Sequence, residues 1–357
     1  MKLDIYNHKA RWENWLTEVQ AQGGIREISK ASSDLILKFT ADMETGQNVA
    51  RGSRKGSRSY SRLNVIRVRM VFLAKQLEGR GLHDISKTTP EKLHSLFDDM
   101  RKGRLKKMAG GEYKSVGNYV KVFKAFWHWL QRVGRRNGQS IEDITIDLDT
   151  TDPEPLFVCF TKDDLDKLLP YFSIDEQVRM LFMFDTIVRS PTELVNIKIT
   201  DLSADYREVT VRDEVSKTYG RTMKLLLCSD ELRKYVERNA LKAGDFLFSF
   251  SPTLFNQKLK RIAGEILGER MTKGGSRYSE LTMYDFRHSG AIHWRVGAYK
   301  TKIDALMYRG GWSSLAILNY YTRRIGMRDS IEKDDLLAGT DKSALEKELN
   351  QQRSTLK

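Results

Sequence analysis

The sequence predicts a mainly α-helical protein of two domains with one small antiparallel β-sheet. Its 357 residues exceed the ~250–300 at which a single hydrophobic core usually stops growing. Apolar residues recur every three or four positions over most of the chain, and that is the period of an amphipathic helix. Residues 208–215 and 222–227 instead alternate like strands around a turn at T-Y-G-R, which predicts a single hairpin.

The first predicted domain, residues 1–150, is a small bundle of helices. One of them has an apolar face that runs from Leu63 to Leu77. The other, within residues 115–133, has Val116, Tyr119, Val120, Phe123, Trp127 and Leu130 on one face. We expect these aromatic side chains to form the core of the bundle.

Prolines and a helix-capping pattern divide the chain. Residues 151–157 are predicted to be a linker, because Pro153 and Pro155 cannot continue a helix or a sheet ladder. The second domain, residues 158–330, opens with Thr161 and Asp164 at capping-box spacing. Residues 331–357 are polar and are predicted to be a tail.

The charge of the chain favours a polyanionic partner. There are 61 Lys and Arg against 47 Asp and Glu, so the net charge is +14. From Arg51 to Arg69 the sequence has seven basic residues and no acid, in a Gly/Ser-rich loop that leads into a helix. This arrangement is typical of a grip on a DNA backbone, whereas the alternative is a solvated charged loop. The candidate DNA-binding residues are Arg51, Arg54, Lys55, Arg58, Arg62, Arg67, Lys121 and Lys124.

The sequence does not indicate a disulfide-rich, zinc-binding, membrane-spanning or secreted protein. Cys159 and Cys228 are too few for a disulfide framework or a zinc knuckle. No apolar run approaches the ~18–20 residues that span a bilayer, and the N-terminus lacks the apolar segment of a secretion signal. We therefore expect a cytoplasmic protein with no membrane partner, no metal and no cofactor.

Two segments carry candidate catalytic cations. Arg189 ends an apolar helix, and Ser190, Pro191 and Glu193 have the spacing of a new helix start with a capping box. Arg189 is therefore expected at a helix junction, where it either faces a pocket or caps the preceding helix. Lys217, before the hairpin turn, is a candidate for contact with a phosphate, and Lys224 on the returning strand competes with it.

The third block has a more specific spacing. It comprises Y-D-F-R-H, G-W-S-S and N-Y-Y-T, with Arg287 25 residues before Trp312 and Tyr321 nine residues after it. With R-S-P-T-E-L and S-K-T upstream, this order resembles the tyrosine recombinase family, also called phage-type integrases. The resemblance covers the chain up to about residue 325. It implies an N-terminal helical core-binding (SAM-like) domain and a mixed, mostly helical catalytic domain with a small antiparallel β-sheet.

The resemblance assigns a role to each motif residue. Arg189 and Arg287 match the two phosphate-binding arginines, Lys217 the hairpin lysine, and Trp312 the His/Trp position. Tyr321 matches the nucleophile, while Tyr320 is expected to pack against the domain because it points about 100° away on a helix. One residue departs from the pattern.

Tyr284 stands where most members have the His of H-x-x-R. A Tyr at this position resembles some archaeal-type members of the family. Together with the basic segment Arg51–Arg69, this departure favours a mobile-element integrase.

The implied activity is metal-free strand exchange on double-stranded DNA that carries a specific recombination site. The family works as a homo-tetramer and proceeds through a 3′-phosphotyrosyl link and a four-way junction. Two arginines suit this chemistry, because they hold phosphate oxygens through fixed N–H donors and stay protonated.

Two rival functions remain. One is a DNA-binding protein of the same fold without catalysis, which the Tyr284 departure favours. The other is a metal-dependent nuclease built around Asp285, His288 and His293.

Overall fold

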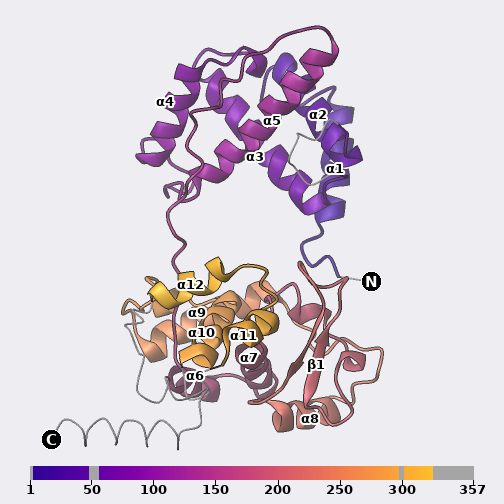
Figure 1. The fold of residues 1–357 in the computed structure, drawn as a ribbon, viewed down its shortest axis with the longest axis vertical. Coiled ribbons are helices and arrows are strands. Elements are labelled where there is room, and N and C mark those ends of the chain that lie inside the picture. The colour runs from indigo at the N-terminus through magenta and orange to yellow at the C-terminus, as the bar shows by residue number, and fades with distance from the viewer. Residues whose placement is uncertain (1–2, 48–55, 297–300, 325–357) are drawn as a thin grey trace, which may run out of the picture. The chain divides into compact units, whose positions relative to one another are not determined.

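The computed structural model describes residues 3–47, 56–296 and 301–324 (Figure 1). The chain divides into two compact units. One comprises residues 4–155, and the other comprises residues 1–3 together with residues 156–357. The division at Pro155–Leu156 falls inside the Pro-containing segment 151–157.

The unit formed by residues 4–155 is entirely helical in its described part. Serine and threonine side chains start several of its helices, since Ser29, Ser59 and Thr89 each accept a backbone N–H at the N-cap. Its helices are α1 (His8–Ala21), α2 (Lys30–Thr45), α3 (Tyr60–Glu78), the 3₁₀ turn η1 (Ile85–Lys87), α4 (Pro90–Arg101) and α5 (Val116–Arg136).

The core of this unit forms where α5 packs against α2 and α3. Phe39 of α2 contacts Phe126 and Trp129 of α5, with ring centroids 5.5 and 5.3 Å away. The indole N–H of Trp129 is satisfied inside this core by Asp42 Oδ2 at 2.8 Å. The aromatic residues of α5 therefore form core, as the sequence predicted, except that Tyr119 stays half-buried.

The second unit is also mainly helical and has one hairpin. Its strands β1 (Glu208–Val211) and β2 (Arg221–Lys224) pair antiparallel, with Val209 opposite Met223. The helices before the hairpin are α6 (Lys162–Leu168), η2 (Leu169–Tyr171), α7 (Ile174–Thr186), η3 (Leu194–Asn196) and η4 (Ile199–Asp201). Those after it are α8 (Ser229–Arg238), α9 (Pro252–Leu267), η5 (Tyr278–Glu280), α10 (Met283–Val296), α11 (Ile303–Gly310) and α12 (Leu315–Arg324). The predicted fold class is confirmed.

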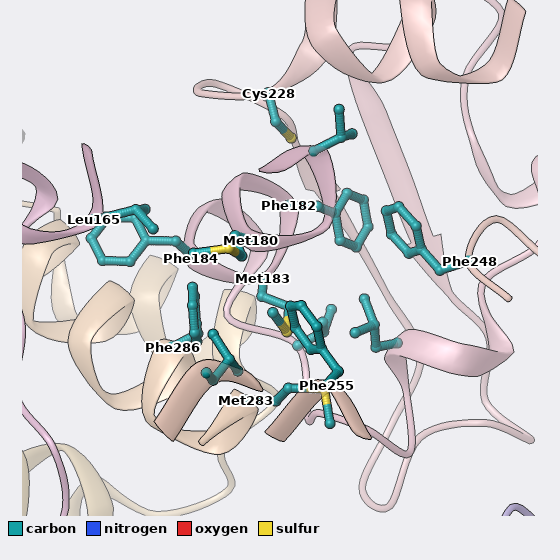
Figure 2. Close-up of a cluster of buried hydrophobic side chains, with 14 of the residues drawn as sticks. Leu165, Met180, Phe182, Met183, Phe184, Cys228, Phe248, Phe255, Met283 and Phe286 are labelled. Atoms are coloured by element: carbon teal, nitrogen blue, oxygen red, sulfur yellow. The ribbon is translucent and has the colours of Figure 1, made fainter. Parts of the chain in front are cut away.

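Helix α7 lies at the centre of the second unit and packs closely against α10. Figure 2 shows the aromatic and methionine side chains around α7, with Phe182 beside Phe248 and Phe184 on the side of Phe286. Each is fully buried, and burying a side chain of this size contributes roughly 1.5–3 kcal/mol. This packing fixes the end of α7 relative to α10. Arg189 lies just beyond the end of α7, and Arg287 lies within α10.

The predicted capping box of α6 is present, because Thr161 and Asp164 bond reciprocally across the first turn. Of the helices in residues 3–47, 56–296 and 301–324, none is long and apolar enough to cross a membrane.

Candidate active site

Arg189 follows α7 directly. Ile187 ends that helix with a left-handed backbone (φ 50°), so the chain turns sharply before the arginine. The guanidinium donates to Glu193 Oε1 at 2.7 Å, to the carbonyl of Gly311 at 2.7 Å and to Thr218 Oγ1 at 3.4 Å. Arg189 therefore faces the interior of the unit, because its hydrogen-bond partners include Thr218 of the hairpin and Gly311, the residue after α11.

The predicted helix start at Ser190 is wrong. No α-helix follows it, the Ser190–Pro191 bond is cis, and the next helical residues are the 3₁₀ turn η3. The carboxylate of Glu193 does not cap Ser190 but accepts the backbone N–H of Arg189 at 2.9 Å. Glu193 therefore binds Arg189 instead of capping a helix, and the capping pattern in the sequence does not predict this pairing.

Arg287 is buried in α10, with only 1% of its surface exposed. It donates to the carbonyl of Ile187 at 2.6 Å and to the carbonyl of Gly310. Its guanidinium carbon lies 4.7 Å from the centroid of the Trp312 ring, a cation–π distance. Arg189 and Arg287 therefore donate to adjacent carbonyls of one turn, at Gly311 and Gly310.

Sequence reasoning missed Arg221, the first residue of β2. Its guanidinium is fully buried and donates to both Glu193 oxygens, at 2.8 and 3.3 Å. Burial raises the pKa of Glu193, but the hydrogen bonds and charges of Arg221 and Arg189 outweigh it and lower the pKa to about 2. Glu193 is therefore an anion shared by two arginines.

Lys217 lies in the connection between the two strands, and its side chain is exposed. The next residue, Thr218, donates to the Gly311 carbonyl at 2.9 Å, so this part of the hairpin reaches the same turn as Arg189. Lys224 pairs with Glu208 at the other end of the two strands. Lys217 is thus the chain neighbour of a residue that contacts this turn, whereas Lys224 lies at the end of the strands away from the connection.

Tyr284 lies in the first turn of α10 and is 46% exposed. Its ring meets that of His288 edge-on at 4.9 Å, and His288 also contacts Phe157 at 4.8 Å. Burial, together with the charge of Arg287, lowers the pKa of His288 to about 3. The imidazole of His288 is therefore neutral at physiological pH.

The residues of the nuclease hypothesis do not gather. Asp285 accepts hydrogen bonds from the backbone of Val158 and from Thr282. His288 faces Phe157, whereas His293 contacts Phe184. Within the described part of the chain, no three His, Cys, Asp or Glu side chains are grouped as a metal site.

The tyrosine pair lies in α12. Tyr320 is half-buried, contacts the ring of Phe157 at 5.8 Å and packs on a small cluster with Trp312, which confirms the packing predicted for it. The backbone of Tyr321 lies in the same helix, while its side chain falls outside the described residues. Trp312 itself is buried, 3% exposed, under the guanidinium of Arg287.

The predicted DNA-binding cations of the first unit fall into separate groups. Burial lowers the pKa of Arg62, and the nearby charges of Arg69 and Arg58 lower it further, so these three lie together. Arg67 instead donates to Asn64 and stacks over Trp15 at 4.8 Å.

Arg69, which was not among the candidates, lies over Tyr119 at 5.2 Å. Lys124 donates to Ile146, whereas Lys121 is exposed. Arg51, Arg54 and Lys55 lie outside the described residues.

Comparison with solved structures identifies the fold. A lambda integrase dimer bound to a COC′ core site matches with a TM-score of 0.60 and 14% identity, over 84% of this chain and 79% of that one. The Tn1549 transposon integrase in complex with transposon right end DNA matches with a TM-score of 0.57 and 15% identity, over 80% of this chain and 94% of that one. The XerH recombinase in a post-cleavage complex with palindromic difH substrate gives 0.55 and 15%, over 79% of each chain.

The chain has the tyrosine recombinase fold. No family model and no curated protein matches the sequence. The tyrosine recombinase fold is thus preserved here at a sequence identity of about one residue in seven.

Proposed function

We propose that this protein is a site-specific DNA recombinase that cleaves and rejoins DNA through a covalent 3′-phosphotyrosyl intermediate, without a metal ion. One observation carries the proposal. Arg189 and Arg287 come from segments about 100 residues apart, yet both donate to the turn that leads into α12, the helix of Tyr321. The tyrosine recombinase fold supports the same reading.

The two arginines would bind the scissile phosphate. Attack on a phosphodiester adds negative charge to its equatorial oxygens, and guanidinium N–H donors at fixed positions stabilise that charge. Arg189 offers donors at a partly exposed site, with 14% of its side chain accessible. Trp312, packed on Arg287, would hold that guanidinium in place.

Tyr321 would be the nucleophile. Its hydroxyl would release its proton to solvent as the oxygen attacks the phosphorus. The bond to the 5′-oxygen would break, and the departing oxygen would take a proton. Lys217 is the proposed proton donor, because its side chain is exposed and the next residue, Thr218, contacts the turn at Gly311. Tyr284 replaces the usual His and is proposed to position the phosphate or to relay a proton.

The substrate would be double-stranded DNA with a specific recombination site. Residues 1–150 would act as the core-binding domain, through Arg58, Arg62, Arg67, Lys121 and Lys124 and the segment of Arg51, Arg54 and Lys55. Residues 158–330 would form the catalytic domain, joined by the linker 151–157. Integrases of this fold have been crystallised with DNA, one of them as a dimer, and this supports a DNA partner.

For assembly we propose a homo-tetramer on DNA that exchanges strands through a four-way junction. The tail, residues 331–357, would contact a neighbouring subunit. A mobile-element integrase is the favoured setting, on the basis of the basic segment Arg51–Arg69 and the Tyr284 substitution.

The alternative is a DNA-binding protein of the same fold without catalysis. Tyr284 favours it, and so does the deep burial of Arg287, 1% exposed and bonded to two carbonyls. A silent protein would bind DNA but would form no covalent product.

Covalent capture separates the two functions. The protein is mixed with nicked random-sequence duplexes in EDTA, then denatured, and any DNA still attached to it is recovered. We expect adducts from the wild type and none from Tyr321→Phe, while Tyr320→Phe serves as the matched control. DNA binding without adducts in every variant would support the silent binder.

A further inference from the structure

Three arginines donate to three consecutive carbonyls at the C-terminal end of α11. Arg221 Nε donates to the carbonyl of Arg309 at 2.8 Å, Arg287 to that of Gly310, and Arg189 Nη2 to that of Gly311 at 2.7 Å. Residues 309–311, which we call the turn 309–311, are the last two residues of α11 and its C-cap Gly311, and Trp312 and α12 follow them. The turn is therefore held by Arg189 and Arg287, the two cations proposed to bind the phosphate, and by Arg221, which has no role in the proposed function.

Arg221 differs from the other two in where its donors go. Its side chain is 0% exposed, so it cannot reach DNA in this conformation. Both Nη atoms donate to Glu193, and Nε donates to the turn. Glu193 in turn holds Arg189 through Nη1 at 2.7 Å and through its backbone N–H. Arg221 thus links Glu193, the anion that orients Arg189, with the turn 309–311. Arg189 contacts the same turn.

The hairpin and α11 are joined at several more points. Thr218 Oγ1 donates to the Gly311 carbonyl, and Tyr219 donates to the Met307 carbonyl at 3.4 Å. The backbone N–H of Thr222 donates to the hydroxyl of Tyr308 at 3.2 Å. Any shift of Arg221 would therefore move a connected unit that includes the segment of Lys217.

Gly311 makes the contact with Arg221 close. Its φ is +61°, and a Cβ added there would lie 3.0 Å from Nη1 and 3.1 Å from Cζ of Arg221. The backbone of the turn thus lies directly against the guanidinium, and a side chain would have to displace it.

We propose that Arg221 is a positioning residue, which holds Glu193 and the turn 309–311 so that Arg189 and α12 are aligned for attack on the phosphate. In the DNA-free protein the Gly311 carbonyl accepts from the Nη2 of Arg189 that would otherwise bind a phosphate oxygen. When phosphate replaces that carbonyl, Arg221 keeps the turn in place through Arg309. The inference rests on the proposed recombinase function.

The test separates binding from chemistry. Arg221→Met, Arg221→Lys and Gly311→Ala are compared with the wild type on nicked random-sequence duplexes in EDTA. Fluorescence anisotropy gives the Kd for the duplex pool, and the rate of adduct formation is measured at saturating DNA. We expect Arg221→Met to slow adduct formation on the order of 100-fold, the effect of a misplacement near 1 Å, with Kd changed less than about 3-fold. Arg221→Lys should be intermediate, because one ammonium cannot reproduce the fork.

Arg212→Met is the matched control. Arg212 lies in the same hairpin connection and pairs with Asp201 and Glu214, but it donates to Asn196 and not to the turn. Its adduct rate should stay within about 3-fold of the wild type. Equal rates for Arg212→Met and Arg221→Met would overturn the proposal, as would a loss for Arg221→Met that lies wholly in Kd.

Thermal melting shows whether each variant folds. If Arg221→Met does not fold, Gly311→Ala decides, since its Cβ displaces the same guanidinium, and a wild-type rate for it overturns the proposal. No adduct from the wild type removes the recombinase function and this inference with it. Adducts that are insensitive to Arg221 remove the inference alone.

Discussion

At the scale of residues, the site depends on burial more than on residue type. His288 shows this clearly, because burial against residues such as Phe157 leaves it poorly solvated and its chain neighbour Arg287 adds a nearby positive charge. Protonation of His288 in the folded state would place a second cation beside the buried guanidinium. The neutral imidazole is therefore part of how the fold tolerates Arg287 inside the unit.

Stability should consequently fall in mild acid. The folded-state pKa of His288 is about 3, whereas the unfolded value is near ~6.5. Between these values the unfolded chain binds a proton that the folded chain does not, so the free energy of unfolding decreases as pH falls, by about 1.4 kcal/mol per pH unit. Glu193, with a folded pKa of about 2, adds its own loss only below its unfolded value. Urea unfolding from pH 7 to pH 5 measures the slope.

His288→Asn is the informative variant for this slope. It removes the titrating group and should flatten the decrease between pH 6.5 and 5. An unchanged slope in His288→Asn would show that other groups control acid stability.

The residue scale also shows what sequence reasoning could reach. The spacing from Arg287 to Trp312 identifies two side chains that do stack, and Tyr320, which the helix geometry predicts to pack, contacts Phe157. Arg221 was missed because its partner Glu193 lies 28 residues away, and no local pattern marks such a pair. The Ser190 cap was predicted wrongly for the same reason, since Glu193 is committed to arginines.

At the scale of elements, the pairing of α7 with α10 positions Arg189 and Arg287, the proposed phosphate-binding cations. Gly290 lies at the closest approach of the two helices, where an added Cβ would lie 2.4 Å from the carbonyl oxygen of Phe184. Only one helical turn separates Gly290 from Arg287 on α10. The absence of a side chain at Gly290 therefore sets how close the arginine comes to the carbonyl of Ile187.

Gly290→Ala should push these two helices apart. We expect a loss of roughly 1–3 kcal/mol in the free energy of unfolding, as for other overpacked cores, together with slower adduct formation. Gly244→Ala is the control, because nothing lies within 4 Å of the Cβ it would add. Chemical denaturation of both variants gives the comparison, and equal stabilities would mean that α7 and α10 can separate without cost.

The element patterns were predictable to different degrees. The amphipathic helices and the hairpin follow from period and turn residues, and the structure has them. The strand β1 ends earlier than predicted, because Arg212 to Gly220 form the connection instead of continuing the ladder, and β2 ends at Lys224 instead of residue 227.

At the scale of the whole molecule, net charge is the dominant feature. An excess of +14 favours DNA at any sequence, because each neutralised phosphate releases counterions. Only some of these cations lie near one another, however, and others are paired with acids. Arg58, Arg62 and Arg69 lie together, whereas Arg104 is neutralised by Asp98 and Asp99. Composition predicts the total charge, and the folded structure shows which cations are paired with acids.

Salt dependence of DNA binding distinguishes these two kinds of arginine. Arg62→Ala should reduce the slope of log K against log salt by about 1, the effect of losing one phosphate contact. Arg104→Ala removes the same charge but should leave the slope unchanged, since its partners are acids of its own unit. Anisotropy titrations across a range of salt concentrations provide both slopes. Equal changes would mean that only net charge matters.

The central claim is that Tyr321 forms a covalent bond to DNA, and its most direct test is to identify the linked residue. Adducts captured in EDTA are digested with nuclease and protease, and the peptides are sequenced by mass spectrometry. We expect a nucleotide mass on Tyr321 in the peptide that contains both tyrosines. A nucleotide on Tyr320, or on any residue outside α12, would contradict the claim.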